Sequence, residues 1–164
     1  MPTTTMAADG EYFFMASHAP KDFHKSRSAN PSLKKMIGMD LTAREVIQLL
    51  RGQVPIRPHE AASIAADPKT GARTLILFGR RGRVLQKVHF EPDNETPARM
   101  ETFDPAGKIA YTLKFSNVLD VGGFAVPFRI DIADGEDRLL LNIERYWTQT
   151  EAPPSAFMLV ESEM

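Results

Sequence analysis

The stretch KIAYTLKFSNV, residues 108–118, alternates between two kinds of side chain along its length. The large apolar members occupy every second position and are Ile109, Tyr111, Leu113 and Phe115. The residues between them are small or polar. Successive side chains of an extended chain point to opposite faces, so this alternation predicts a strand with one buried face and one solvated face. One-sided burial of this kind is typical of an antiparallel sheet.

Similar runs on both sides of this stretch predict a row of seven strands. They cover residues 61–66, 73–78, 83–91, 98–103, 108–118, 128–132 and 138–147. Short turn-forming segments separate them, such as DPKTG at 67–71 and DPAG at 104–107. Because such connections permit only antiparallel neighbours, residues 60–147 are predicted to form a β meander that must curl or close. We therefore expect a mainly β, α+β domain built as an incomplete antiparallel β-barrel.

Two further strands and a short helix are predicted before the meander. The strands are expected at residues 11–17 and 22–26, where β-forming residues follow turn signals. Asn30 and Pro31 have the residue types of a helix N-cap and a first helical position. They predict a short helix near residues 31–37.

A second helix has the clearest local signal in the sequence. Thr42 and Glu45 are spaced as a capping box, and Gly52 stands where a helix C-terminus is expected. A helix near residues 42–51 is therefore predicted. Helices of this length are marginal in water by themselves, so we expect both to lie in the open side of the barrel, against the sheet.

A curled sheet with one apolar face and few helices to fill it predicts an apolar cavity suited to alkyl chains. The candidate lining residues are Met36, Leu49, Val84, Val88, Phe90, Ile109, Tyr111, Leu113, Phe115, Phe128, Ile130, Leu139, Leu141 and Ile143. Burial of each methylene contributes about 0.8 kcal/mol, so one acyl chain needs no specific polar contact. The simpler interpretation of any one of these residues is that it belongs to the hydrophobic core.

Composition excludes several classes of partner and of chemistry. The 164 residues carry a formal net charge of −1, with 43% hydrophobic and 25% charged residues, which indicates one folded domain and no nucleic-acid partner. Cysteine is absent, so this chain has no disulfide, thiolate metal site or lipid-attachment cysteine. The sequence has no run of about 18 apolar residues and no secretory signal pattern. A transmembrane segment is therefore not expected.

The sequence contains no recognisable catalytic or metal-binding pattern. We therefore expect no enzymatic activity, no cofactor and no metal. No two of the four histidines have the spacing of metal ligands on one element. Asp22 and His24 would lie on the same face of a strand, but no third metal ligand lies nearby. Nucleotide-binding, nucleophile-elbow and zincin motifs are missing. One basic cluster, GRRGR at residues 79–83, suits phosphate or lipid headgroups, although a solvated hairpin tip is the simpler interpretation.

Several segments, in their order and spacing, resemble the lipoprotein-localisation factors of the LolA/LolB type. They are LKKMIG at 33–38, DLTAREVIQLLRGQVP at 40–55, FDPAGK at 103–108, VPFRI at 126–130 and PPSAF at 153–157. The resemblance implies an incomplete barrel with helices in its open side. It also implies a monomer in the bacterial periplasm or at the periplasmic face of the outer membrane. Residues 153–160 are expected to pack on the barrel as a final strand or cover.

The departures from that family are at the amino-terminal side. Its members begin with an export signal, often with a lipid-attached cysteine, followed by a long helix and strands that have no counterpart here. We therefore expect an N-terminally truncated domain, and the alternative is a shortened relative whose barrel is more open. The resemblance implies binding of lipoprotein or lipid acyl chains in the cavity. The alternative is an outer-membrane-anchored structural or protein-interaction domain of the same fold, with an envelope protein as its partner and no lipid cargo.

Overall fold

The computed structural model describes residues 4–8, 11–18, 21–28, 30–93 and 95–147, together with Glu151, Pro153 and Ser155. The predicted packing of residues 153–160 therefore lies outside the described residues, apart from two exposed positions. Within the described ranges the structure is dominated by antiparallel strands, with two short α-helices.

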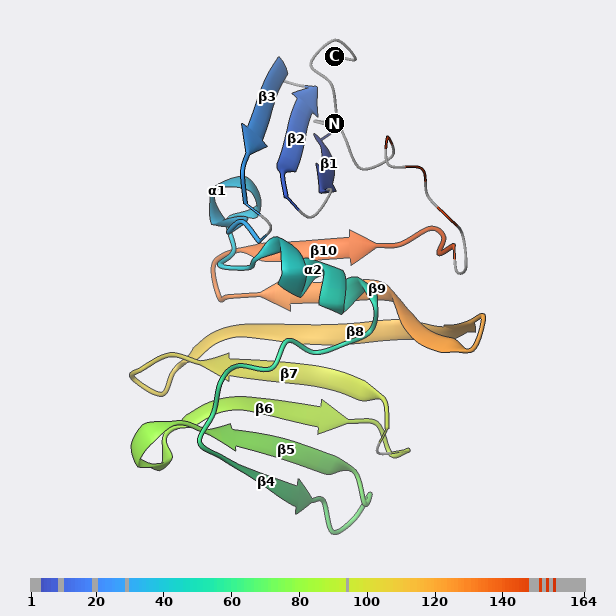
Figure 1. Cartoon of the computed structure of the whole chain (residues 1–164). Coiled ribbons are helices and arrows are strands. Elements are labelled where there is room, and N and C mark those ends of the chain that lie inside the picture. The colour runs from blue at the N-terminus through green and yellow to red at the C-terminus, as the bar shows by residue number, and fades with distance from the viewer. Residues whose placement is uncertain are drawn as a thin grey trace.

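The strands form two sheets, a small one of three strands and a large one of seven (Figure 1). The small sheet has the order β1-β2-β3, and the large one β10-β9-β8-β7-β6-β5-β4. Their bounds are β1 (Thr4–Ala8), β2 (Phe13–His18), β3 (Lys21–Ser26), β4 (Ala61–Ala66), β5 (Arg73–Phe78), β6 (Val84–Phe90), β7 (Pro97–Phe103), β8 (Ile109–Val121), β9 (Phe124–Ala133) and β10 (Arg138–Asn142). The large sheet is a meander whose edge strands, β4 and β10, do not pair with each other. The predicted open, mainly antiparallel β fold is confirmed.

Some strand boundaries differ from the sequence predictions. The strand predicted at 138–147 ends at Asn142, and Ile143 continues only through one backbone hydrogen bond, from its N–H to the Phe128 carbonyl. β9 begins at Phe124, four residues before the predicted start, because the β8–β9 ladder continues to the tight turn at its end. The sequence pattern also missed β1, which pairs with β2.

The second helix, α2 (Ala43–Leu50), starts at a complete capping box. The Thr42 hydroxyl accepts from the Glu45 backbone N–H, and the Glu45 carboxylate accepts from the Thr42 backbone N–H at 2.7 Å. The helix packs on β9, in front of the sheet in Figure 1. This contact covers the apolar side of a helix that would be unstable alone.

The first helix, α1 (Lys34–Ile37), is shorter than predicted, and its predicted N-cap is wrong. Leu33 occupies the N-cap position with no side-chain cap, while Asn30 accepts from the backbone N–H of Arg44 at 2.8 Å. Asn30 therefore helps to cap α2 instead of α1. An amide oxygen can accept from the unpaired N–H groups of any helix start within reach. Asn30 reaches the start of α2, although the start of α1 is nearer to it in sequence.

Two hydrophobic clusters hold these elements together. The larger lies between the large sheet and α2, and the smaller joins the small sheet to the start of α2 through Phe13, Leu33 and Ala43. Val46 packs against both clusters. The helix is thus the element through which the small sheet meets the main core.

Candidate functional site

Most residues predicted to line a cavity are gathered on one face of the large sheet, where they form its core. The cluster contains Leu49, Val88, Phe90, Tyr111, Leu113, Phe115, Ile130, Leu139, Leu141 and Ile143 from the predicted set. It is completed by Met39, Leu41, Met100 and Ile132, which the prediction did not include. Side chains as fully buried as Val88, Leu113 and Ile130 pack against one another and leave little space for a ligand.

Three predicted residues lie elsewhere, and β-bulges account for two of them. Ile109 is 50% exposed because β8 carries an extra residue, Ala110, which packs against the core in its place. Val84 pairs with Phe78 beyond a bulge at Leu85, the extra residue between it and Gln86. Phe128 packs edge-to-face on Tyr146, with ring centroids 5.3 Å apart. The remaining candidate, Met36, has a side chain outside the described set.

The chain after α2 covers the middle of the apolar face. Residues 53–60 cross from the end of α2 to the start of β4, as Figure 1 shows, and we call them the strap. Its buried Pro55 and its Arg57 are both bound by the buried side chain of Gln86. The Arg57 guanidinium also stands 6.0 Å from the ring centroid of Tyr111. Strap and helix together fill most of the cavity that the alternation predicted.

An apolar pocket of about 290 Å³ remains at one end of the sheet, beyond the end of α2. Its walls come from the loop before β7, from β8 and β9, and from the residue after the helix. They are Gly52, Glu95, Thr96, Pro97, Phe115, Val118, Ala125 and Pro127. Only Phe115 was among the predicted lining residues, and Glu95 is the single charged group. Gly52, Glu95 and Thr96 lie at a helix end and in a loop, which carry no alternation, and Pro97, Ala125 and Pro127 lie on parts of β7 and β9 that precede the predicted strand starts.

Gly52 sets how closely the helix end approaches β9. Its φ of +72° is in the left-handed region, where glycine is favoured. A Cβ at this position would lie 2.9 Å from the Ala125 carbonyl oxygen and 3.2 Å from the Pro127 ring. The pocket therefore depends on a glycine for both its backbone conformation and its width.

A partly buried tyrosine is hydrogen-bonded to one of the residues that line this pocket, Pro127. The Tyr146 hydroxyl donates to the Pro127 carbonyl at 2.7 Å, and burial raises the pKa of Tyr146. This bond ties the segment after β10 to the wall of the pocket.

A second cleft, of about 210 Å³, lies at the other end of the sheet. Met39, Leu41, Tyr111 and Ile132 give it an apolar floor, while Asp40, Asp104, Asp134 and Arg57 make its rim charged. The buried Tyr111 hydroxyl has no hydrogen-bond partner among the described residues. Three carboxyl groups at its mouth make this cleft a poorer site for an alkyl chain than the first pocket.

Within the described ranges, no group of three or more His, Asp or Glu side chains is placed to hold a metal ion. Of the described carboxylates, Asp131 has its pKa lowered mainly by the hydrogen-bonded Arg138 guanidinium, and Asp67 and Asp93 by backbone N–H donors of their own turns. These are structural pairings in hairpins and turns. They supply no acid–base pair to either pocket.

A crystal structure of a domain from Vibrio parahaemolyticus, named for outer membrane lipoprotein sorting, superposes on 89% of this chain with a TM-score of 0.50 and 15% identity. The fold is LolA/LolB-like. The chain spans 63% of the length of that Vibrio structure. A LolA superfamily protein from Nitrosomonas europaea has a TM-score of 0.44 and 13% identity, over 92% of this chain and 77% of its own.

The sequence resemblance to the LolA/LolB type is thus confirmed at the level of the fold. No protein-family model and no curated protein matches the sequence. Among the described helices, none has the length and apolar character to cross a bilayer.

Proposed function

We propose that this LolA/LolB-like domain binds acyl chains of a lipoprotein or lipid, without catalysis, in the bacterial cell envelope. The observation that carries the proposal is the pocket beside Gly52, lined mostly by apolar residues, which remains open although helix and strap cover most of the apolar face of the sheet. Its action in the periplasm or at the periplasmic face of the outer membrane belongs to the same proposal.

The chemistry of the pocket suits an alkyl chain. Phe115, Val118, Pro97 and Pro127 present carbon surfaces, and the volume is near the lower end of the range of about 300–1,000 Å³ found for small-molecule sites. Each buried methylene contributes about 0.8 kcal/mol, so insertion of part of one chain already gives measurable affinity. Exposed Leu119 and Phe124 on the same hairpin offer further apolar surface for a longer chain.

The name of the Vibrio domain, which refers to lipoprotein sorting, supports the choice of acyl chains over other apolar ligands. The absence of a charged cluster in the pocket supports it as well. The lipid headgroup or the lipoprotein peptide would then remain outside the part of the pocket that Phe115, Val118 and the prolines line.

A pocket-filling variant tests the proposal. Ala125→Phe places a ring at an exposed position of the pocket wall and should weaken binding of a fluorescent fatty acid at least about tenfold, with an unchanged fold by circular dichroism. The matched control is Ala65→Phe, an exposed alanine on β4 far from the pocket. Equal affinity of both variants and the native chain would place the fatty acid elsewhere and contradict the proposal.

A second candidate, a protein-interaction domain of the same fold, is favoured by one observation. β4 is an edge strand, AASIAA, whose four alanines, Ser63 and Ile64 are all exposed, with Ile64 66% exposed. Such an edge can accept a strand from another protein. Site-specific photocrosslinking from position 64 in cells distinguishes the candidates. A discrete adduct, together with no fatty acid binding, would favour the interaction domain.

A further inference from the structure

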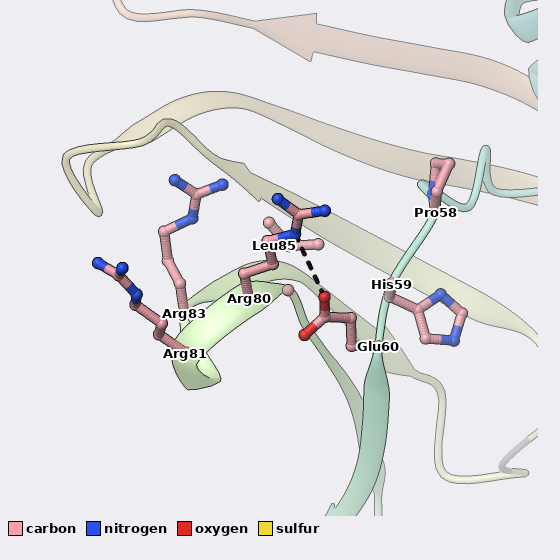
Figure 2. Close-up of a pocket in the computed structure, with 8 residues that line it drawn as sticks. Pro58, His59, Glu60, Arg80, Arg81, Arg83 and Leu85 are labelled. Atoms are coloured by element: carbon pink, nitrogen blue, oxygen red, sulfur yellow. Dashed lines mark ion pairs between the residues drawn. The ribbon is translucent and has the colours of Figure 1, made fainter.

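We propose that a cationic pocket at the turn between β5 and β6 binds a phosphate group. The pocket has a volume of about 780 Å³ and is open to solvent (Figure 2). Its lining residues are Pro58, His59, Glu60, Gly79, Arg80, Arg81, Arg83 and Leu85. The strap end forms one wall, and the turn that contains the 3-10 helix η1 (Arg80–Gly82) forms the other.

Positive charge is concentrated here in a chain whose formal net charge is −1. The lining residues include three arginines and one carboxylate, Glu60, whose Oε1 lies 3.6 Å from the Arg80 Nε. The Arg80 side chain is 93% exposed, so this ion pair contributes little and leaves the rest of its guanidinium free to bind. Arg81 and Arg83 form no ion pair with any described residue, and Figure 2 shows both extending away from Glu60.

The backbone of the turn places an arginine where glycine or asparagine is favoured. Arg81 has φ 60° and ψ 28°, in the left-handed region, and the following Gly82 has φ +70°. A non-glycine residue in this conformation carries an energetic cost, and such residues are concentrated at functional sites. Arg81 therefore stands at a position where its backbone conformation is unfavourable.

The floor and the opposite wall of the pocket are also defined. An ideal Cβ at Gly79 would lie 3.0 Å from both δ-carbons of Leu85, so the glycine lets this side chain fold over the turn as an apolar floor. On the strap side, the His59 Nδ1 lies 3.0 Å from the Arg57 carbonyl oxygen. A carbonyl can only accept, so Nδ1 is the donor in this bond, and the donors toward a phosphate come from the arginines.

Phosphate is the ligand class that this arrangement fits. Guanidinium groups are planar forks that bind two phosphate oxygens at once, and several of them around a hollow raise the local concentration of anions. The phosphate can belong to an anionic lipid headgroup or be free in solution. This site and the acyl-chain pocket lie at opposite ends of β6. The strand begins at the arginine turn and ends at Phe90, which pairs with Pro97 of the acyl-chain pocket. The two sites are therefore separate.

Two probes tell the phosphate sources apart. Co-sedimentation measures binding to vesicles of equal parts phosphatidylglycerol and phosphatidylcholine, with phosphatidylcholine vesicles as the reference. Amide chemical shifts of residues 79–83 measure binding of inorganic phosphate. Both are made at low ionic strength, because screening weakens exposed charges. Vesicle binding that depends on the pocket arginines, with no change of amide shifts on adding phosphate, identifies an anionic lipid headgroup as the ligand. Saturable changes of the amide shifts on adding phosphate identify the free anion.

The decisive comparison is between two triple variants of equal charge. In one variant, Gln replaces Arg80, Arg81 and Arg83. In the other, Gln replaces three exposed arginines that do not line the pocket: Arg44 on α2, Arg51 after α2 and Arg129 on β9. The first should weaken binding at least about tenfold and the second should retain it. Equal losses in both, or binding of neither probe by the native chain, would overturn the proposal.

A single substitution separates binding from folding. Arg81→Gly removes one guanidinium and relieves the left-handed backbone, so it should fold at least as stably as the native chain and bind the same probe more weakly. Unchanged binding by this stable variant would count against a role for Arg81 in the site.

Discussion

Gln86 donates a hydrogen bond from Nε2 to the carbonyl oxygen of Pro55, 3.0 Å away, inside the core. Its Oε1 accepts from the Arg57 backbone N–H at 2.8 Å, so one amide side chain holds two points of the strap. The same Nε2 lies 3.4 Å from the Thr102 hydroxyl, the other fully buried polar side chain of the sheet. This polar clamp keeps the strap on the apolar face and restricts the open space to the ends of the sheet.

Gln86→Leu should destabilise the protein by about 2–3 kcal/mol, because the strap then has a buried carbonyl and an N–H without partners. Urea denaturation measures the loss. Hydrogen exchange at the Arg57 amide should become faster in the same variant. The control Gln53→Leu changes an exposed strap residue. Equal effects of the two substitutions would contradict the role of the clamp.

Thr42→Ala should cost about 1 kcal/mol of folding free energy, since it removes the side-chain acceptor at the start of α2. Thr42→Ser keeps the hydroxyl and should lose much less. Thermal denaturation of the two variants gives the comparison. If Ser and Ala were equally harmful, packing of the threonine methyl group would explain the loss instead of capping.

Gly52→Ala and Gly71→Ala form a matched pair, because both glycines have nearly the same left-handed φ, +72° and +73°. A Cβ at Gly71 meets nothing within 4 Å, whereas at Gly52 it meets β9. Gly52→Ala should therefore be the more destabilising by about 1–3 kcal/mol, the range for overpacking. Similar unfolding free energies for the two variants would show that α2 does not approach β9 as closely as the structure has it.

The local parts of the fold were predictable because their signals are local. Alternation at 108–118 indicated a one-sided strand, and the spacing of Thr42 and Glu45 indicated a helix start. Bulges were not predictable from the pattern. The extra residue Ala110 turns the Ile109 side chain to the exposed face of β8. The sequence does not reveal this, because residues 109–115 show an uninterrupted alternation.

Asp131→Asn should destabilise the protein in a pH-dependent way. Its bond to Arg138 lowers the pKa of Asp131 in the folded state, so the native chain gains stability above the unfolded value of about 3.9 and loses it as pH falls through the folded pKa. The difference in melting temperature between native and variant should be present at pH 7 and shrink below about pH 4. A difference that is the same at pH 3 and pH 7 would contradict this assignment.

The candidate site was predicted only in outline. An apolar face follows from alternation, but the strap that fills it depends on Gln86 and Pro55, which are 31 positions apart, and residues 53–60 have no periodic pattern. The pocket that remains is built from a helix end, a loop and a hairpin. Phe115 alone connects it to the predicted set.

The central claim is that the folded chain binds acyl chains, and native mass spectrometry tests it most directly. The purified protein is mixed with a synthetic diacylated lipopeptide, and its melting temperature is measured in parallel. The account predicts a one-to-one adduct and a raised melting temperature, because a ligand that binds only the folded state stabilises it. A well-folded sample with neither adduct nor shift would contradict the account and leave the protein-interaction domain as the better explanation.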